Sequence, residues 1–243
     1  MLKKLLFVLL IAAVTAGGVF AQQAGTFSIG ARLGPSFGFH NPTDAVKKAQ
    51  EEFGGMVSLN DTGLVNFNFA LYGAYTLIDN LSLAAEFNFH INQGYKITGS
   101  MAIPFLGSMS LEGKGYYSSL DIPILVKYNF LKDPAVFGVL AGPHLSFPLG
   151  KAEIEYEASM MGLSEAGSEK YDMEGITVGL TIGVFGGYKV GPGRFIGDLR
   201  FIFDFNSSQI KDTYIINGVS IKQKEDAMKR RALALTLGYE ISF

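Results

Sequence analysis

Three histidines are the side chains of this 243-residue sequence best suited to proton transfer or metal binding: His40, His90 and His144. Hydrolytic catalysis would set one of them beside a serine or an aspartate. Ser36 and Asp44 lie close to His40 in the sequence but match no such motif. His90 and His144 could share a metal ion, although hydrogen-bonded packing is the commoner role of a histidine on a polar face. We therefore expect no catalytic residue, no metal site, no cofactor and no enzymatic activity.

The chain has no cysteine, so disulfides, thiolate metal sites and cysteine nucleophiles are excluded together. Its 20 basic and 22 acidic residues give a formal net charge of −2. This balance supplies no positive field for nucleic acid, and we expect no nucleic-acid partner. Stability must come from packing and from strand pairing.

Acidic residues gather in one polar segment, residues 150–174. Such carboxylates can bind calcium or bridge to lipopolysaccharide through divalent ions. No calcium-loop spacing is present, so a solvated acidic loop is the preferred interpretation. The residues concerned are Glu153, Glu155, Glu157, Glu165, Glu169, Asp172 and Glu174.

Alternation of large apolar residues with small or polar ones recurs along the chain and predicts strands with one apolar face. Hydrophobic residues make up 48% of the chain, yet they are diluted one-to-one with Gly, Ser, Thr and Asn and form no long block after the first twenty residues. A helical membrane protein would hold them in continuous blocks. Eight strands are expected, at 27–39, 65–77, 81–92, 120–130, 137–147, 176–188, 195–205 and 232–243.

Short and long connections alternate between these strands. The short ones are at residues 79–80, 133–134 and 191–193, and the long polar ones are at 41–63, 93–115, 150–174 and 206–230. Outer-membrane barrels have short periplasmic turns and long outer loops, which would leave both termini in the periplasm. Within the long loops, residues 44–53 could form a brief helix and Asn217-Gly218 could form a hairpin tip.

Two kinds of barrel fit alternating strands, and they differ in which face points inward. A soluble lipocalin-like barrel turns its apolar face toward a ligand, whereas a membrane barrel turns it toward lipid. The other face is here rich in Gly, Ser, Thr and Asn and poor in Lys and Glu, as expected of a crowded hydrated lumen. The predicted fold is an all-β, transmembrane, antiparallel up-and-down barrel of about eight strands in residues 22–243.

The predicted lumen carries charges of both signs. The basic residues are Arg32, Lys127, Lys189, Arg194 and Arg200, and the acidic ones are Glu86, Asp121, Asp198, Asp204 and Glu240. An eight-stranded ring is just wide enough for side chains to fill, so we expect ion pairs that plug it. A charge-selective pore would show one sign in excess. The predicted network consists of Arg32, Glu86, Asp121, Lys127, Asp198, Arg200, Asp204 and Glu240.

Three segments resemble the PorT-like porin-family β-barrels, a group of small outer-membrane proteins. They are FSIGARLG at residues 27–34, LDIPILVKY at 120–128 and GVLAGPHL at 138–145. The resemblance runs over essentially the whole chain after the first twenty residues. It implies a barrel in the outer membrane whose relatives are called porins or are linked to protein secretion, and it implies no catalytic or ligand-binding residues.

Both ends of the sequence carry expected sorting signals. A basic start, an apolar stretch from Leu5 to Val14 and small residues before Gln22 predict a signal peptide at residues 1–21, cleaved near Ala21. By resemblance to outer-membrane proteins, the alternating end of the chain is expected to be read by the barrel-assembly machinery. The residues of this assembly signal are Tyr239, Ile241 and Phe243.

The function expected from the sequence is that of a scaffold without catalytic activity, which presents its outer loops from the outer membrane. Its expected partners are outer-membrane lipid, the assembly machinery and an extracellular ligand held by the loops. Two alternatives stay open: a narrow porin for small solutes and a soluble periplasmic lipocalin-like barrel that binds a ligand.

Overall fold

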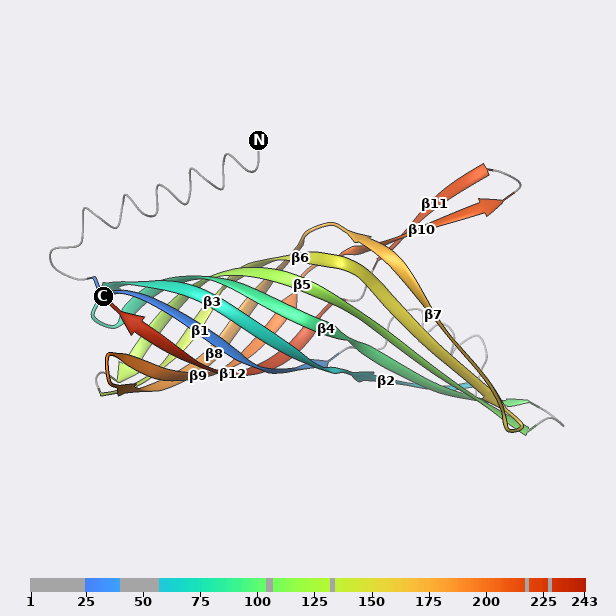
Figure 1. The fold of residues 1–243 in the computed structure, drawn as a ribbon, viewed down its shortest axis with the longest axis horizontal. Coiled ribbons are helices and arrows are strands. Elements are labelled where there is room, and N and C mark those ends of the chain that lie inside the picture. Colours follow the sequence, from blue (N-terminus) through green and yellow to red (C-terminus); the bar gives the residue numbers. More distant parts are fainter. Residues whose placement is uncertain (1–24, 40–56, 104–106, 132–133, 217–218, 227–228) are drawn as a thin grey trace.

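The computed structural model describes residues 25–39, 57–103, 107–131, 134–216, 219–226 and 229–243 (Figure 1). The predicted signal peptide, His40 and the predicted helix at 44–53 lie outside these ranges. The described residues contain no helix able to cross a membrane. Their strands are β1 (Phe27–Phe39), β2 (Val57–Gly63), β3 (Val65–Ile78), β4 (Leu81–Ile103), β5 (Gly107–Leu131), β6 (Ala135–Met160), β7 (Leu163–Glu174), β8 (Thr177–Val190), β9 (Gly193–Asp204), β10 (Gln209–Ile216), β11 (Val219–Asp226) and β12 (Arg231–Ser242).

Eight of these strands form a closed antiparallel ring in the order β1, β3, β4, β5, β6, β8, β9 and β12. The ring closes where β12 pairs with β1, with Leu33 opposite Leu237 and Ser28 opposite Ser242. Closure leaves the ring without an unpaired edge, which the interior of a bilayer requires of a β structure. The predicted eight-stranded, up-and-down barrel is confirmed.

The ring has an apolar outside and a polar inside. Leu33 is 52% exposed on β1, whereas its neighbour Arg32 is 4% exposed, and along β3 Phe67 and Leu71 are each 48% exposed. Alternate residues of a strand point to opposite faces, so the apolar residues form a continuous outer surface. We call this surface the lipid band. Because the apolar face of the strands points outward, the alternative of a lipocalin-like barrel, whose apolar face would point inward, is contradicted.

Three ring strands continue far beyond the lipid band. β4, β5 and β6 have 23, 25 and 26 residues, whereas about 9–11 residues suffice for a transmembrane strand. Their outer halves pair with each other, with β2 at the β4 edge and with β7 at the β6 edge. We call this region the outer sheet, and Figure 1 shows it extending to the right beyond the barrel.

The outer sheet corrects the prediction of long irregular loops at residues 93–115 and 150–174. These segments are strands, because their polar residues alternate with Tyr, Ile and Gly and pair across strands just as apolar residues do. The predicted hairpin in the last long connection is confirmed, since β10 and β11 pair with Ile216 opposite Val219. The two tip residues, 217–218, lie outside the described ranges.

Leu71 lies at the middle of β3 in the lipid band and offers a test of the membrane placement. Leu71→Arg should lower the free energy of unfolding by about 2–4 kcal/mol, because a guanidinium would face hydrocarbon. Leu163→Arg is the matched control, since Leu163 is 79% exposed on β7, beyond the band, and should change stability by about 0.5 kcal/mol or less. Urea unfolding from lipid vesicles measures both, and equal losses would contradict the placement.

Candidate functional site

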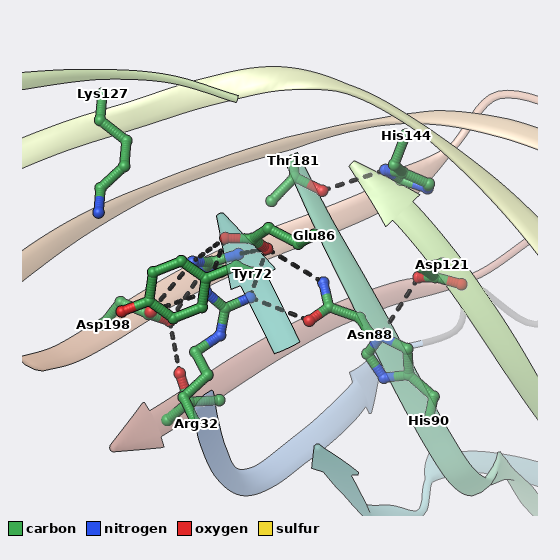
Figure 2. Close-up of polar contacts among 12 residues, drawn as sticks. Arg32, Tyr72, Glu86, Asn88, His90, Asp121, Lys127, His144, Thr181 and Asp198 are labelled. Carbon is green, nitrogen blue, oxygen red and sulfur yellow. Dashed lines mark hydrogen bonds and ion pairs between the residues drawn. The ribbon is translucent and has the colours of Figure 1, made fainter. Parts of the chain in front are cut away.

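A carboxylate held by two arginines occupies the centre of the lumen, and Figure 2 shows Glu86 with Arg32. Arg32 on β1 donates to Oε1 and Oε2 of Glu86 at 2.8 and 2.5 Å. Arg200 on β9 donates to Oε2 and Oε1 of the same residue at 2.6 and 3.1 Å. Asp198 accepts from Nε and Nη2 of Arg200 at 2.8 and 3.0 Å, so two carboxylates offset two guanidiniums. None of the four residues is more than 5% exposed.

The ion pair between Arg200 and Glu86 crosses the barrel. β9 and β4 are four strands apart in either direction around the ring of eight, so they are opposite walls. Two arginines in bidentate contact with one carboxylate hold these walls at a fixed separation. A cluster of this kind fills the lumen with paired charge where a soluble domain would have an apolar core.

A second cluster lies closer to the outer sheet and is centred on Arg230, the residue before β12. Its Nη2 lies 2.7 Å from Oδ2 of Asp121 on β5 and 3.2 Å from Oδ1 of Asp204 on β9. Its Nη1 donates to Oε1 of Gln93 on β4 at 2.9 Å. Since β12 lies opposite β5 in the ring, the ion pair of Arg230 with Asp121 is a second contact between opposite walls of the lumen.

Two of the histidines belong to this second cluster. Nε2 of His90 lies 3.2 Å from Oδ2 of Asp121, and Nε2 of His144 lies 2.8 Å from Oδ1 of Asp204. Nδ1 of His144 lies 3.1 Å from the hydroxyl of Thr181. The described residues contain no group of three or more acidic or histidine side chains arranged to hold a metal.

Hydrolase triads consist of a hydroxyl, an imidazole and a carboxylate linked by hydrogen bonds. Thr181, His144 and Asp204 are linked in this order. Thr181 and His144 are 3% and 1% exposed. Catalysis needs room for a scissile bond beside the nucleophile. Because the packing around Thr181 and His144 is dense, we interpret the contacts of His144 as structural.

A third cluster lies on the side of the short turns. Glu240 on β12 accepts a hydrogen bond from the Tyr72 hydroxyl at 3.1 Å, and its Oε1 lies 3.5 Å from Nη1 of Arg194. Nζ of Lys127 on β5 is 3.9 Å from Oε2 of the same carboxylate. The lysine therefore makes the third charged contact between opposite walls, although a longer one than the other two.

All eight residues predicted for the lumen network lie in these clusters, and the structure adds others. The sequence places Arg230 in the connection 206–230, but the structure adds it to the lumen. Lys189, also predicted for the lumen, is exposed and lines the cavity at the short-turn end of the barrel. With Arg230, five basic residues meet five acidic ones, so the signs balance in the described lumen. The uncharged partners that the sequence did not single out are Tyr72, Asn88, Gln93, Ser119, Thr181 and Thr236.

Comparison with known proteins agrees with this architecture. The profile of a family described as the outer membrane protein beta-barrel domain matches residues 20–209, more than half of the chain. The chain belongs to this family. It is therefore an integral outer-membrane β-barrel, and the lipid band is the surface that meets the membrane. No curated protein matches the sequence.

Several solved outer-membrane barrels align with the chain at low identity. Ail of Yersinia pestis is 13% identical, with 90% of this chain and 100% of Ail covered and a TM-score of 0.32. OprG of Pseudomonas aeruginosa is 12% identical, with 90% and 96% covered and a TM-score of 0.43. The protease OmpT of Escherichia coli is 13% identical, with 90% and 97% covered and a TM-score of 0.45. These likenesses carry no argument about activity.

Outside the lipid band, the outer sheet of this family member carries ladders of opposite charge on one face. Glu112 lies 2.7 Å from Nζ of Lys96 and 3.0 Å from Nζ of Lys114, and hydrogen bonds from both lysines lower the pKa of this carboxyl below 4.5. A hydrogen bond to Glu155 raises the pKa of the Tyr116 hydroxyl to about 12. These partly exposed pairs give cross-strand order to the sheet.

The acidic segment shares these ladders. Glu153 pairs with Lys170 at 3.3 Å, and Asp172 pairs with Lys151 at 3.3 Å. The prediction of a solvated acidic loop was wrong about the loop, because these residues lie in β6 and β7. It was right about exposure for most of the segment, since β7 is exposed along most of its length.

The predicted assembly residues complete the seam of the barrel. The Tyr239 hydroxyl donates to the carbonyl of Val190 at 2.9 Å, and the amide of Phe243 donates to the carbonyl of Phe27 at 2.8 Å. Ile241 and Phe243 are 37% and 72% exposed on the lipid side. Recognition by the assembly machinery stays a prediction.

Arg230 and Arg231 form a matched pair for measuring what the lumen contacts contribute. Arg230→Met should lower the free energy of unfolding by about 3–5 kcal/mol, because Asp121 and Asp204 would lose their shared guanidinium while buried. Arg231 is exposed, so Arg231→Met should change stability by about 0.5 kcal/mol or less. Urea unfolding in vesicles measures both values. A loss below about 1 kcal/mol for Arg230→Met would show that the second cluster adds no stability.

Proposed function

We propose that this protein is a closed scaffold: the barrel neither conducts solutes nor catalyses a reaction, and it holds the outer sheet beyond the membrane as a surface for an extracellular ligand. The observation that carries the proposal is the set of ties between opposite walls of the lumen, from Arg200 to Glu86 and from Arg230 to Asp121. Side chains that bond across an eight-stranded ring occupy the space that a water path would need.

The balance of charge supports closure over conduction. A selective pore exposes rings of charge of one sign to water. Here each of the two central arginine clusters contacts two carboxylates, and Arg32, Glu86, Arg200 and Arg230 are all 4% exposed or less. Charges that are buried and paired have little capacity left for a passing ion.

The outer sheet supports the presenting role. It is made of hydrogen-bonded strands, so it holds its side chains at fixed spacing, as a binding surface requires. Its exposed face carries both signs of charge and tyrosines, which suit a polar partner such as a surface glycan or a protein. Within the family, we further propose membership of the PorT-like group, supported by the segments at residues 27–34, 120–128 and 138–145.

Single-channel recording in a planar lipid bilayer tests closure against the narrow-porin alternative. The refolded protein should give no steady conductance steps, whereas a general porin recorded in the same bilayer should conduct. Folding is verified beforehand by heat-modifiable migration in electrophoresis. Steady steps whose size changes in Arg200→Ala would contradict the proposal, because that result would place Arg200 along a water path.

A further inference from the structure

The end of the barrel with the short turns contains a cavity of about 620 Å³. Asp79 of the β3–β4 turn and Pro192 of the β8–β9 turn lie at its rim. In outer-membrane barrels the short turns face the periplasm, so we call this cavity the periplasmic vestibule. Its volume lies within the range of about 300–1,000 Å³ typical of small-molecule sites.

Lys127 lines the vestibule, and its ammonium group makes a long contact with one carboxylate. The residue is 8% exposed, and its nearest charged partner, Oε2 of Glu240, is 3.9 Å away, beyond hydrogen-bond distance. That carboxylate is shared with Arg194 and with the Tyr72 hydroxyl. Figure 2 shows Lys127 apart from the central cluster, with its nitrogen directed into the lumen.

Two aromatic rings also lie close to this ammonium. Its nitrogen lies 4.5 Å from the ring centroid of Phe185 and 5.7 Å from that of Tyr72. Cation–π contacts attract a cation, but they provide no acceptor for its three N–H donors. Burial of an ammonium is costly unless an anion and hydrogen bonds accompany it. The geometry therefore leaves a position for an anion inside the vestibule.

The rest of the lining indicates what such an anion would be attached to. Phe185 and Ile196 form an apolar wall, and small hydroxyl residues, among them Ser28, Thr76 and Ser82, line another part. A flat or chair-shaped ring with hydroxyl groups would contact both surfaces. We propose that the periplasmic vestibule binds a small hydroxylated ring compound with one anionic group, a carboxylate or a phosphate, whose charge is held by Lys127 and Arg194.

The central cluster lies beyond the vestibule. Glu86 and the two arginines that contact it are buried and do not line the cavity, so we expect a ligand that enters from the periplasm to stop at or before their paired side chains. The site would bind its ligand without passing it on. The inference rests on the lining of the vestibule and stands whether or not the barrel conducts, which a conductance recording decides separately.

Isothermal titration of the refolded barrel in detergent tests the site with glucuronate, glucose 6-phosphate and neutral glucose. At least one of the two anions should bind about tenfold or more tightly than glucose, because a charge-assisted contact would be made only by the anion. The tighter of the two identifies the anionic group as carboxylate or phosphate. Lys127→Met should weaken that binding about tenfold or more, and Arg194→Gln should weaken it in the same direction.

Lys170→Met is the matched control, because it removes a lysine of the outer sheet that pairs with Glu153 and should leave binding unchanged. Heat-modifiable migration verifies that each variant is folded, and Arg194→Gln provides the test if Lys127→Met does not fold. Equal binding of the anions and glucose would overturn the proposal. So would an unchanged affinity in a folded Lys127→Met or, where that variant fails to fold, in Arg194→Gln.

Discussion

The structure depends on the pairing of charges buried inside a ring of eight strands. A barrel of this size must turn one face of every strand inward, and the outward faces are already committed to lipid. The inward faces then carry the residues that could not face lipid, and charged groups among them must find partners within the lumen. Glu86 between Arg32 and Arg200 solves this problem at the centre, and Arg230 between Asp121 and Asp204 solves it nearer the outer sheet.

Those contacts also explain how a narrow membrane barrel can carry a large extension. β4, β5 and β6 run from the lipid band into the outer sheet, and residues at their inner faces, Glu86, Asp121 and His144, are bound to the opposite wall or to a neighbouring strand. These contacts fix the part of each strand that lies within the barrel. Beyond the lipid, cross-strand pairs such as Lys96 with Glu112 take over the ordering of the sheet.

The ring could be predicted from the sequence because contact with lipid requires an apolar residue at every second position of a strand. All eight strands and the eight lumen residues follow from this alternation. The outer sheet could not be predicted in this way, because its strands do not contact lipid and Lys, Glu and Ser occupy their positions. The polar composition of residues 206–230 predicts a loop that includes Arg230, although this residue has the same parity as Ala232 and Ala234, which face inward. The choice of ion-pair partners, such as Glu86 with Arg200, depends on the relative height of opposite strands, which only the closed ring determines.

A double-mutant cycle on Arg200 and Glu86 tests most directly whether pairing across the lumen holds the barrel together. Arg200→Met, Glu86→Gln and the double variant are unfolded in urea from lipid vesicles, with Lys96 and Glu112 as a partly exposed reference pair. We expect a coupling of about 2–3 kcal/mol for the buried pair and less than about 1 kcal/mol for the partly exposed one. A coupling within about 0.5 kcal/mol of zero for Arg200 and Glu86 would contradict it.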